Sequence, residues 1–316
     1  VGFIERPDTA DQIARRGLRI ERDGRGIVVP DVTLYTSPGE ALQAEQWDVI
    51  VCALKSFHTD AAVRDLIDTG LPVPAILSLQ NGVDNEPLIA SLVGADGVIA
   101  GTVCSAVGKP GVGKAVEEKR RGIGIALGHP QSRALVEALA GAELNARAYP
   151  AAGPMKWSKL LTNLTGNATS AILDLPVAAL FADDRLYRVE VAVLRECLAV
   201  MRAMGLKPVD LPGTPVRALA LAAERLPRFI AQPALTKALG SGRGDKMPSF
   251  HIDLHSGRGR TEVRFLNGAV VRHGEAHGVA TPVNRVLTDV LEALSSGEAD
   301  LETFRHNPDA LLARLG

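Results

Sequence analysis

The pattern of apolar residues changes near Pro150, and this change limits the folds that the chain can adopt. Before it, short apolar runs alternate with stretches of helical periodicity, and the clearest run is Trp47–Leu54 (WDVIVCAL), bounded by polar residues. Such a run is typical of a strand that is buried on both faces of a sheet. Strands that alternate with helices indicate a doubly wound, mostly parallel sheet, so residues 1–150 are predicted to form an α/β domain.

The other elements expected in this domain are a strand end, a hairpin with Asp-Gly at its turn, three helices and four further strands. They are Val1–Arg6, Gly17–Val29, the helices His58–Thr69, Glu86–Val93 and Gln131–Ala140, and the strands Ala75–Gln80, Gly97–Val103, Gly122–Gly128 and Leu144–Tyr149.

After Pro150 we find no convincing strand, and residues 151–316 are predicted to form an all-helical domain. A chain of 316 residues that is 46% hydrophobic is long enough for two domains with proper cores. The predicted helices are Met155–Leu173, Asp184–Met204, Val216–Leu226, Ser249–His255, Thr261–His277, Pro282–Ser295 and Leu301–Leu315.

Composition narrows the class of protein. The formal net charge is −1 and no long Lys/Arg run is present, so no nucleic-acid partner is expected. No apolar run reaches the roughly 18 residues that span a bilayer, and no secretory signal opens the sequence. The isolated cysteines Cys52, Cys104 and Cys197 form neither a disulfide set nor a metal-binding spacing, which indicates a reducing compartment. A cytoplasmic enzyme is expected.

The helix predicted around Met155–Ile172 carries an unusual polar stripe. Lys159, Asn163, Asn167 and Ser170 follow at steps of four, four and three residues, so they lie on one face. A face that meets only water usually carries more charge, and this stripe suits a specific hydrogen-bonded ligand. The alternative is a half-buried helix whose amides bond to neighbouring backbone.

Further polar residues are expected at one edge of the sheet. Lys55 directly follows the apolar run Trp47–Leu54, and Asn81 directly follows the strand Ala75–Gln80. Ligands of open α/β sheets bind beyond the carboxyl ends of the strands, which favours a site there. A solvated loop charge at Lys55 and a simple turn at Asn81 are the alternatives.

Arg6, preceded by Glu5, lies just past the first strand, where nucleotide-binding folds read the adenosine ribose. An acid there favours a free 2′-hydroxyl and an arginine accommodates a 2′-phosphate, so residue type alone does not separate NAD from NADP. A solvent-facing pair is the alternative. No G-x-G-x-x-G loop is found before this strand.

Histidines recur at helical spacing as His251 with His255 and as His273 with His277. Such a pair can bind zinc, but no third ligand and no H-E-x-x-H pattern accompanies either pair, so no metal site is predicted. Ser249 suits the N-cap of its helix, and Thr261 with Glu262 suits the start of the next one.

Taken together, these segments resemble the 2-dehydropantoate 2-reductase (ketopantoate reductase) family. The likeness covers essentially the whole chain in order, and the family pairs an N-terminal Rossmann domain with a helical C-terminal domain. The segments that carry it are LKSFHTDA (Leu54–Ala61), LSLQNGV (Leu77–Val83), KWSKLLTNLTGNATSA (Lys156–Ala171), MPSFHIDLHSGRGRTEVRFLNG (Met247–Gly268) and HGVATPVN (His277–Asn284).

The resemblance implies a role for each candidate residue. It implies that Lys159 is the catalytic lysine and that Glu262 is the acid that contacts the substrate oxygen. It also implies that the substrate is bound by Asn163, Asn167 and Ser249. Lys55 and Asn81 would face the nicotinamide and the substrate, and Arg6 would read the 2′-phosphate of NADPH.

Two features depart from the family pattern. The family's first strand and Gly-rich loop are missing, so either the sequence is truncated at its start or the element that clasps the pyrophosphate is absent. A further asparagine of some members is also not found, and Val177 lies near its place. The exact substrate therefore stays open.

The function expected from the resemblance is NADPH-dependent reduction of a 2-oxo acid, 2-dehydropantoate to pantoate in pantothenate biosynthesis, with Lys159 protonating the forming alkoxide. The alternatives are a sibling oxidoreductase that acts on another oxo acid and a non-catalytic metabolite-binding relative. The expected partner is a small-molecule 2-oxo acid, and a homodimer is possible.

Overall fold

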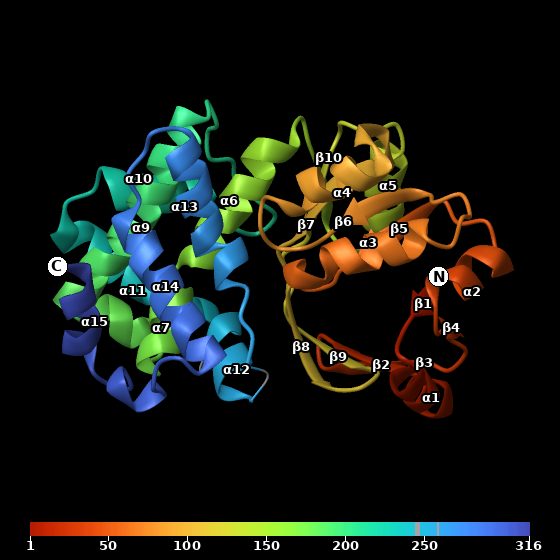
Figure 1. The fold of residues 1–316 in the computed structure, drawn as a ribbon, viewed down its shortest axis with the longest axis horizontal. Helices are drawn as coiled ribbons and strands as arrows, with labels where there is room; N and C mark the ends of the chain where they lie inside the picture. The colour runs from red at the N-terminus through yellow and green to blue at the C-terminus, as the bar shows by residue number, and fades with distance from the viewer. Residues whose placement is uncertain (244–246, 258) are drawn as a thin grey trace. The chain divides into compact units, whose positions relative to one another are not determined.

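The computed structural model describes residues 1–243, 247–257 and 259–316, without the side chains of 238–243. The chain forms two compact units, shown in Figure 1. Unit 1 comprises Val1–Gln80, Asn85–Ala152 and Pro212–Thr214, and unit 2 comprises Asn81–Asp84, Gly153–Leu211 and Pro215–Gly316. The short loop Asn81–Asp84 thus interrupts unit 1 but belongs to unit 2.

The main sheet of unit 1 has five strands in the order β11-β10-β7-β6-β5. β5, β6 and β7 are parallel, β10 is antiparallel to β7, and β11 is parallel to β10. The mostly parallel sheet predicted from the alternation of elements is therefore confirmed. The strands are β5 (Val49–Cys52), β6 (Ala75–Ser78), β7 (Val98–Val103), β10 (Ile123–Ala126) and β11 (Ala146–Tyr149).

Helices α3 (Thr59–Ile67), α4 (Asn85–Val93) and α5 (Ser132–Gly141) connect these strands and cover the sheet. Because successive strand residues point to opposite faces, Ile76 and Leu77 of β6 enter two different core clusters. The cluster of Ile76 includes residues of α3 and α4, whereas the cluster of Leu77 is packed by residues of α5. A double-sided core of this kind is what the doubly wound arrangement requires.

The prediction that Trp47–Leu54 is a strand buried on both faces is only half right. β5 is the terminal strand of the five-stranded sheet, and Val51 is 51% exposed while Cys52 is buried. An apolar run records the residue types of a strand but not which strands flank it, so the position of β5 could not be read from the run.

The remainder of unit 1 forms two smaller sheets. β1 (Gly2–Ile4) pairs in parallel with β4 (Thr33–Tyr35), and the other sheet has the order β3-β2-β9-β8. The hairpin predicted at Gly17–Val29 is present as β2 (Leu18–Arg22) and β3 (Arg25–Val29), with Asp23 and Gly24 at positive φ in its turn.

Several elements of unit 1 were not predicted. Except for the helix Pro7–Arg16, they have only three to seven residues, too few to show a clear periodicity, whereas Pro7–Arg16 has ten residues with Ala10 and Ile13 on its buried face and could have been predicted from its pattern. They are α1 (Pro7–Arg16), β4, α2 (Pro38–Ala44), β8 (Ala106–Gly111), β9 (Lys114–Lys119) and the 3₁₀ turns η1 (Ser56–His58) and η2 (Ala95–Gly97).

Unit 2 is helical, and no strand occurs among its described residues. Its longest fully described helix is α9 (Asp184–Ala203), which Asp183 caps by accepting hydrogen bonds from the backbone of Arg185 and Leu186. The others are α6 (Ala152–Leu164), α7 (Asn167–Leu173), α8 (Val177–Ala182), α10 (Val216–Glu224), α11 (Arg228–Arg243), α12 (Ser249–His255), α13 (Asn267–Ala276), α14 (Pro282–Ser296), α15 (Pro308–Leu315) and the 3₁₀ turns η3 (Val263–Phe265) and η4 (Leu301–Thr303).

Three predicted helices are interrupted, and α8 and α11 were not predicted. Met155–Leu173 is divided between α6 and α7 at Gly166, Thr261–His277 is divided between η3 and α13, and Leu301–Leu315 is divided between η4 and α15. Gly166 has φ 65° and its N–H donates to Oε2 of the buried Glu190. A left-handed glycine ends a helix, and the buried carboxylate satisfies the N–H that the break exposes.

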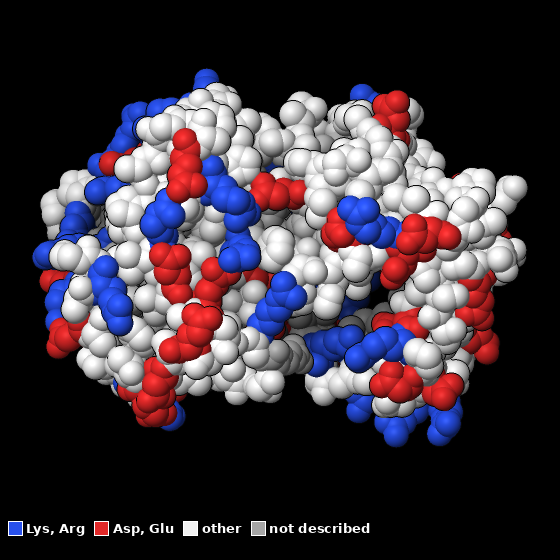
Figure 2. Space-filling model, in the orientation of Figure 1, with Lys and Arg blue, Asp and Glu red and all other residues white. Residues whose placement is uncertain are grey.

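Charged side chains of both signs are interspersed over the visible face of each unit in Figure 2. Within the described part of the chain, no helix is both long and apolar enough to cross a membrane. The cysteines Cys52, Cys104 and Cys197 are buried and form no disulfide bond.

Candidate functional site

The predicted polar stripe begins on α6 and continues onto α7. Lys159 and Asn163 lie one turn apart on α6, both half-buried, and Asn167 is the first residue of α7 and is buried. Ser170 serves a different purpose, because its hydroxyl donates to the backbone oxygen of Leu175 and closes the turn after α7. Ser170 therefore bonds neighbouring backbone, as the alternative interpretation of the stripe expected, and the other three residues form the candidate site.

Asn163 joins α6 to the loop that follows strand β6. Its Nδ2 donates to Oδ1 of Asn81 over 2.9 Å. Asn81 lies in unit 2 together with α6, although it directly follows Gln80 of unit 1. The structure therefore brings together two of the residues that the sequence singled out 82 positions apart.

The far end of the Asn81 loop is held by Asp84, whose partly exposed carboxylate contacts two residues of α13. Oδ2 of Asp84 lies 2.6 Å from Nη2 of Arg272, and its Oδ1 lies 2.7 Å from Nε2 of His273. Burial raises the pKa of Asp84, but hydrogen bonds and charge from His273 and Arg272 outweigh it, and the net pKa is lowered. The ring of His273 in turn packs edge-on against Trp157 of α6.

Asn167 joins α7 to the start of α12. Its Nδ2 donates to Oγ of Ser249 over 3.3 Å, and its Oδ1 accepts from the backbone N–H of Phe250 over 3.0 Å. Ser249 was predicted to be the N-cap of α12, but Pro248 occupies that position and Ser249 is the first helical residue. Asn167 supplies from another helix the acceptor that an N-cap would supply locally.

Glu262 is buried in unit 2 and precedes η3, where its backbone oxygen accepts from Phe265 and Leu266. It was predicted at the start of a long helix, but α13 begins only at Asn267. Lys159 and Glu262 thus share a unit with the pairs Asn81–Asn163 and Asn167–Ser249.

The remaining candidates, Arg6 and Lys55, lie in unit 1. Lys55 follows β5 and is the N-cap of η1, and its backbone oxygen accepts from His58. Arg6 is exposed after β1, and its backbone oxygen receives the first N–H groups of α1. The Arg6 side chain therefore lies at the end of β1 and is exposed, not packed in the core.

Sequence reasoning missed a buried network beneath the loop that carries Lys55. Gln80 donates from Nε2 to the backbone oxygen of Leu54 over 2.9 Å and to the hydroxyl of Thr59 over 2.8 Å. Thr59 donates to Oδ1 of Asn85, whose Nδ2 donates to Ser56. The sequence signal that could have indicated this network is Gln80, a polar residue at the end of a buried apolar strand and directly before Asn81.

These unit 1 residues fit a nucleotide cofactor. β5 and β6 end side by side, because Cys52 pairs with Ser78, while β7 continues past Ala100 to Val103, and open α/β sheets bind ligands beyond such ends. The network of Gln80 fixes the loop there, which lets Lys55 be presented from a rigid support.

Comparison with known protein families gives two matches. Residues 1–127 match the family model described as ketopantoate reductase PanE/ApbA, and residues 153–295 match the model of the ketopantoate reductase PanE/ApbA C terminal. Together the two matches cover both units.

Named relatives agree with the family models. A 2-dehydropantoate 2-reductase of Halobacterium salinarum is 30% identical over 281 residues, which are 86% of each chain. One of Streptococcus pyogenes serotype M1 is 25% identical over 260 residues, 81% of this chain and 78% of the relative.

Solved structures show the same architecture. A PanE/ApbA family ketopantoate reductase from Ralstonia eutropha JMP134 has a TM-score of 0.77 at 28% identity, covering 93% of this chain and 90% of that one. A D-mandelate dehydrogenase, in a ternary structure with NADH and anilino(oxo)acetate, has a TM-score of 0.74 at 21% identity, covering 94% and 89%. At that identity the second likeness concerns the fold alone.

Proposed function

The chain belongs to the ketopantoate reductase PanE/ApbA family, and we propose that it reduces 2-dehydropantoate to pantoate with NADPH. Membership makes it an oxidoreductase of the 2-dehydropantoate 2-reductase type, which reduces an oxo acid with a pyridine nucleotide. The observation that supports the proposal most directly is the pairing of Asn163 with Asn81 and of Asn167 with Ser249, in the unit that carries Lys159.

Lys159 is proposed as the general acid. A bound nicotinamide cofactor would supply the hydride, and the ketone oxygen then needs a proton as it becomes a hydroxyl. A lysine ammonium donates such a proton from Nζ, and positioned acid catalysis accelerates reactions by about 10²–10⁴-fold. Buried Glu262 is proposed to contact the same substrate oxygen and to favour the charged form of the lysine.

The amides are proposed to orient the substrate. Amide N–H groups and a serine hydroxyl can donate to a carboxylate and can also bond a hydroxyl, as the two ends of pantoate require. Asn163, Asn167 and Ser249 already hold fixed partners within the protein, so their orientation costs little entropy when a substrate binds.

Arg6 and Lys55 are proposed to bind the cofactor, with Arg6 on the 2′-phosphate that distinguishes NADPH from NADH. An arginine after the first strand accommodates that phosphate through a bidentate contact. Glu5, which would favour a free 2′-hydroxyl, precedes it, so the preference between the two cofactors rests on which side chain faces the ribose.

The test is a kinetic comparison with a panel of 2-oxo acids, in which the absorbance of NADPH or NADH reports turnover. We expect 2-dehydropantoate to have the highest kcat/KM and NADPH to be preferred over NADH. Turnover of another 2-oxo acid with 2-dehydropantoate inert would replace the proposal by a sibling oxidoreductase.

Calorimetry with NADPH on the same chain tests the second alternative. We expect binding with one cofactor per chain. Binding of the oxo acid without binding of either nucleotide would instead support a metabolite-binding relative that does not catalyse the reduction.

A further inference from the structure

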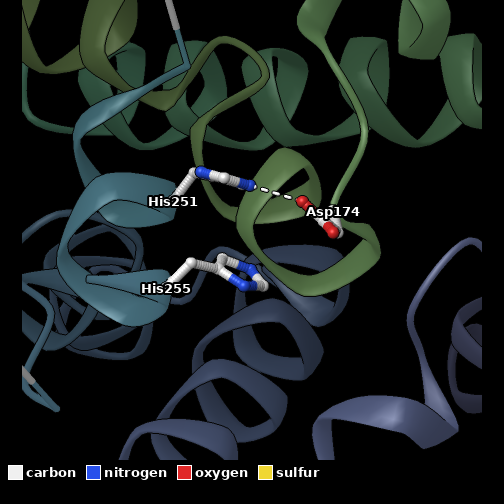
Figure 3. Close-up of side chains that lie close together, drawn as sticks. All are labelled: Asp174, His251 and His255. Carbon is white, nitrogen blue, oxygen red and sulfur yellow. Dashed lines mark hydrogen bonds and ion pairs between the residues drawn. The ribbon is translucent and has the colours of Figure 1, made fainter. Parts of the chain in front are cut away.

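Three potential metal ligands converge at the ends of α7 and α12. Asp174 is the C-cap of α7, and His251 and His255 lie one turn apart on α12 (Figure 3). One ligand atom from each residue lies within 4.8 Å of those of the other two. We propose that Asp174, His251 and His255 bind a divalent transition metal of the zinc or nickel class.

The donor set determines the class of metal. Two imidazoles and one carboxylate are ligands that Zn²⁺ and Ni²⁺ accept readily, whereas Mg²⁺ and Ca²⁺ require mainly oxygen. With three protein ligands, the remaining coordination positions are filled by water. His255 is exposed, so water and the metal have access from solvent.

Two of the ligands are already oriented by neighbours. Nε2 of His255 lies 3.0 Å from the backbone oxygen of Ala171, and because a carbonyl only accepts, this nitrogen carries the proton. In neutral His255 the nitrogen left unprotonated is then Nδ1. Metal-binding histidines in proteins commonly donate their other N–H to a backbone carbonyl in this way.

The carboxylate of Asp174 is oriented from the other side. Nε of Arg305 lies 3.1 Å from its Oδ2 and Nε2 of His306 lies 3.8 Å from the same oxygen, whereas Oδ1 faces His251 at 2.6 Å. One carboxylate oxygen of Asp174 is therefore directed at His251, and the other is held by Arg305.

The charges around the proposed site act on a bound metal in opposite directions. Arg305 and a protonated His306 would repel the metal, so the carboxylate must compensate. The carboxyl ends of α7 and α12, at Asp174 and His255, add partial negative charge that favours a cation.

The geometry needs only side-chain movement. Metal–ligand bonds of about 2.0–2.2 Å in a tetrahedral site place the ligand atoms about 3.4 Å apart. The pair His251–Asp174 at 2.6 Å must open slightly, and the rings of His251 and His255, stacked at 4.2 Å, must turn toward a common point. Both rings and the carboxylate can do this by rotation about their side-chain bonds.

The consequence concerns the pair of helices that carries Asn167 and Ser249. Asn167 bonds the start of α12, and the proposed metal joins the end of α12 to the end of α7. A bound metal would therefore stabilise the end of the α7–α12 contact that Asn167 does not hold. This effect does not depend on which substrate the site takes.

The test uses the full chain without a histidine tag, stripped of metal with EDTA and desalted. We expect ZnCl₂ to bind by calorimetry with one ion per chain and to raise Tm, and MgCl₂ to do neither. His255→Ala and Asp174→Asn should each weaken zinc binding by about 100-fold or more. His277→Ala removes a histidine exposed at the end of another helix and should leave zinc binding unchanged.

A spectroscopic measurement tests metal binding without relying on a change in the stability of the protein. Co²⁺ bound to two imidazoles and a carboxylate should give visible absorption bands without the sulfur charge-transfer band, and His255→Ala should abolish them. Absence of zinc binding in the unmodified chain would overturn the proposal. Equal binding by the unmodified chain and His255→Ala would overturn it as well.

Discussion

Asn163 donates its side-chain amide hydrogen to Oδ1 of Asn81, and this bond of 2.9 Å ties the loop after strand β6 to helix α6. The same loop is held at its other end by Asp84, which contacts Arg272 and His273 of α13. A short segment anchored at both ends is a rigid support. Because Asn163 bonds the side-chain oxygen of Asn81, the amide plane of Asn81 is fixed in orientation.

We predict that Asn163→Ala raises the KM for the oxo acid and lowers kcat/KM by about 10–100-fold. A hydrogen bond to a charged group contributes about 1.5–3 kcal/mol, and Asn81 would also lose its fixed orientation. Steady-state kinetics at saturating cofactor measures the effect. Thr162→Ala removes only a hydroxyl that bonds the backbone of Lys159 within α6, and it should leave KM within about twofold. An unchanged KM in Asn163→Ala would exclude Asn163 from the substrate site.

Lys159→Ala should lower kcat by about 10²–10⁴-fold while the affinity for NADPH stays nearly the same. The reason is that the ammonium acts in the transition state, where the alkoxide forms, and the cofactor residues proposed here lie on other elements. Lys207→Ala, which removes an exposed lysine from the same unit, serves as the control. A normal kcat in Lys159→Ala, with the variant folded by circular dichroism, would remove Lys159 from the mechanism.

Gln80→Leu should destabilise unit 1 and raise the KM for the cofactor. The leucine would leave the buried hydroxyl of Thr59 and the backbone oxygen of Leu54 without the amide that bonds them, at about 1–3 kcal/mol for each unsatisfied group. The loop bearing Lys55 would lose its support. Thermal unfolding and cofactor titration measure the two effects, with Gln43→Leu on exposed α2 as the matched control. If both variants behave alike, the network does not position the loop.

Much of the fold could be predicted from residue patterns. The hairpin β2–β3 follows from Asp23-Gly24, since few residue pairs other than Asn-Gly and Asp-Gly accept the positive φ of that turn. The parallel core follows from alternation of apolar runs and helices. The exposure of Val51 could not be predicted, because it depends on which strand lies beside β5.

For the candidate site, residues that share one element could be chosen from their spacing, whereas the contacts that form between separate elements could not be predicted. Lys159 and Asn163 follow from helical spacing on α6. Ser170 shares their spacing but bonds Leu175, a contact that depends on the turn after α7. The approach of Asp174 to the histidine pair was also not predicted, because Asp174 precedes His251 by 77 positions and only the packing of α7 on α12 brings them together.

Asp84 should make the stability of unit 2 depend on pH in the acid range. Its pKa is lowered in the folded protein relative to its ordinary value of 3.8, so folding is favoured whenever the carboxylate is ionised. This contribution is complete above about pH 5 and is lost as the pH falls through the ordinary value toward the lower folded pKa. Urea midpoints at several pH values should show Asp84→Asn less stable at neutral pH and approaching the unmodified chain in acid.

Asp289→Asn, on an exposed position of α14, is the control for Asp84→Asn and should follow the unmodified chain at every pH. A difference between Asp84→Asn and the unmodified chain that stays constant down to the lowest pH at which both fold would contradict the assignment. In that case the loss would come from packing and not from the charge that Arg272 and His273 stabilise.

Gly166→Ala should destabilise the protein by about 2–5 kcal/mol and displace Asn167 from Ser249. The φ of 65° costs an alanine about 1–2 kcal/mol, and its Cβ would lie 2.8 Å from Cγ1 of the buried Val177, which adds an overpacking cost of about 1–3 kcal/mol. Gly205→Ala separates the two contributions, because Gly205 has φ 71° but no atom within 4 Å of the added Cβ. It should lose only the backbone part. Urea unfolding followed by tryptophan fluorescence measures both variants, since Trp157 reports on unit 2. Equal losses in the two variants would show that Val177 does not restrict this position.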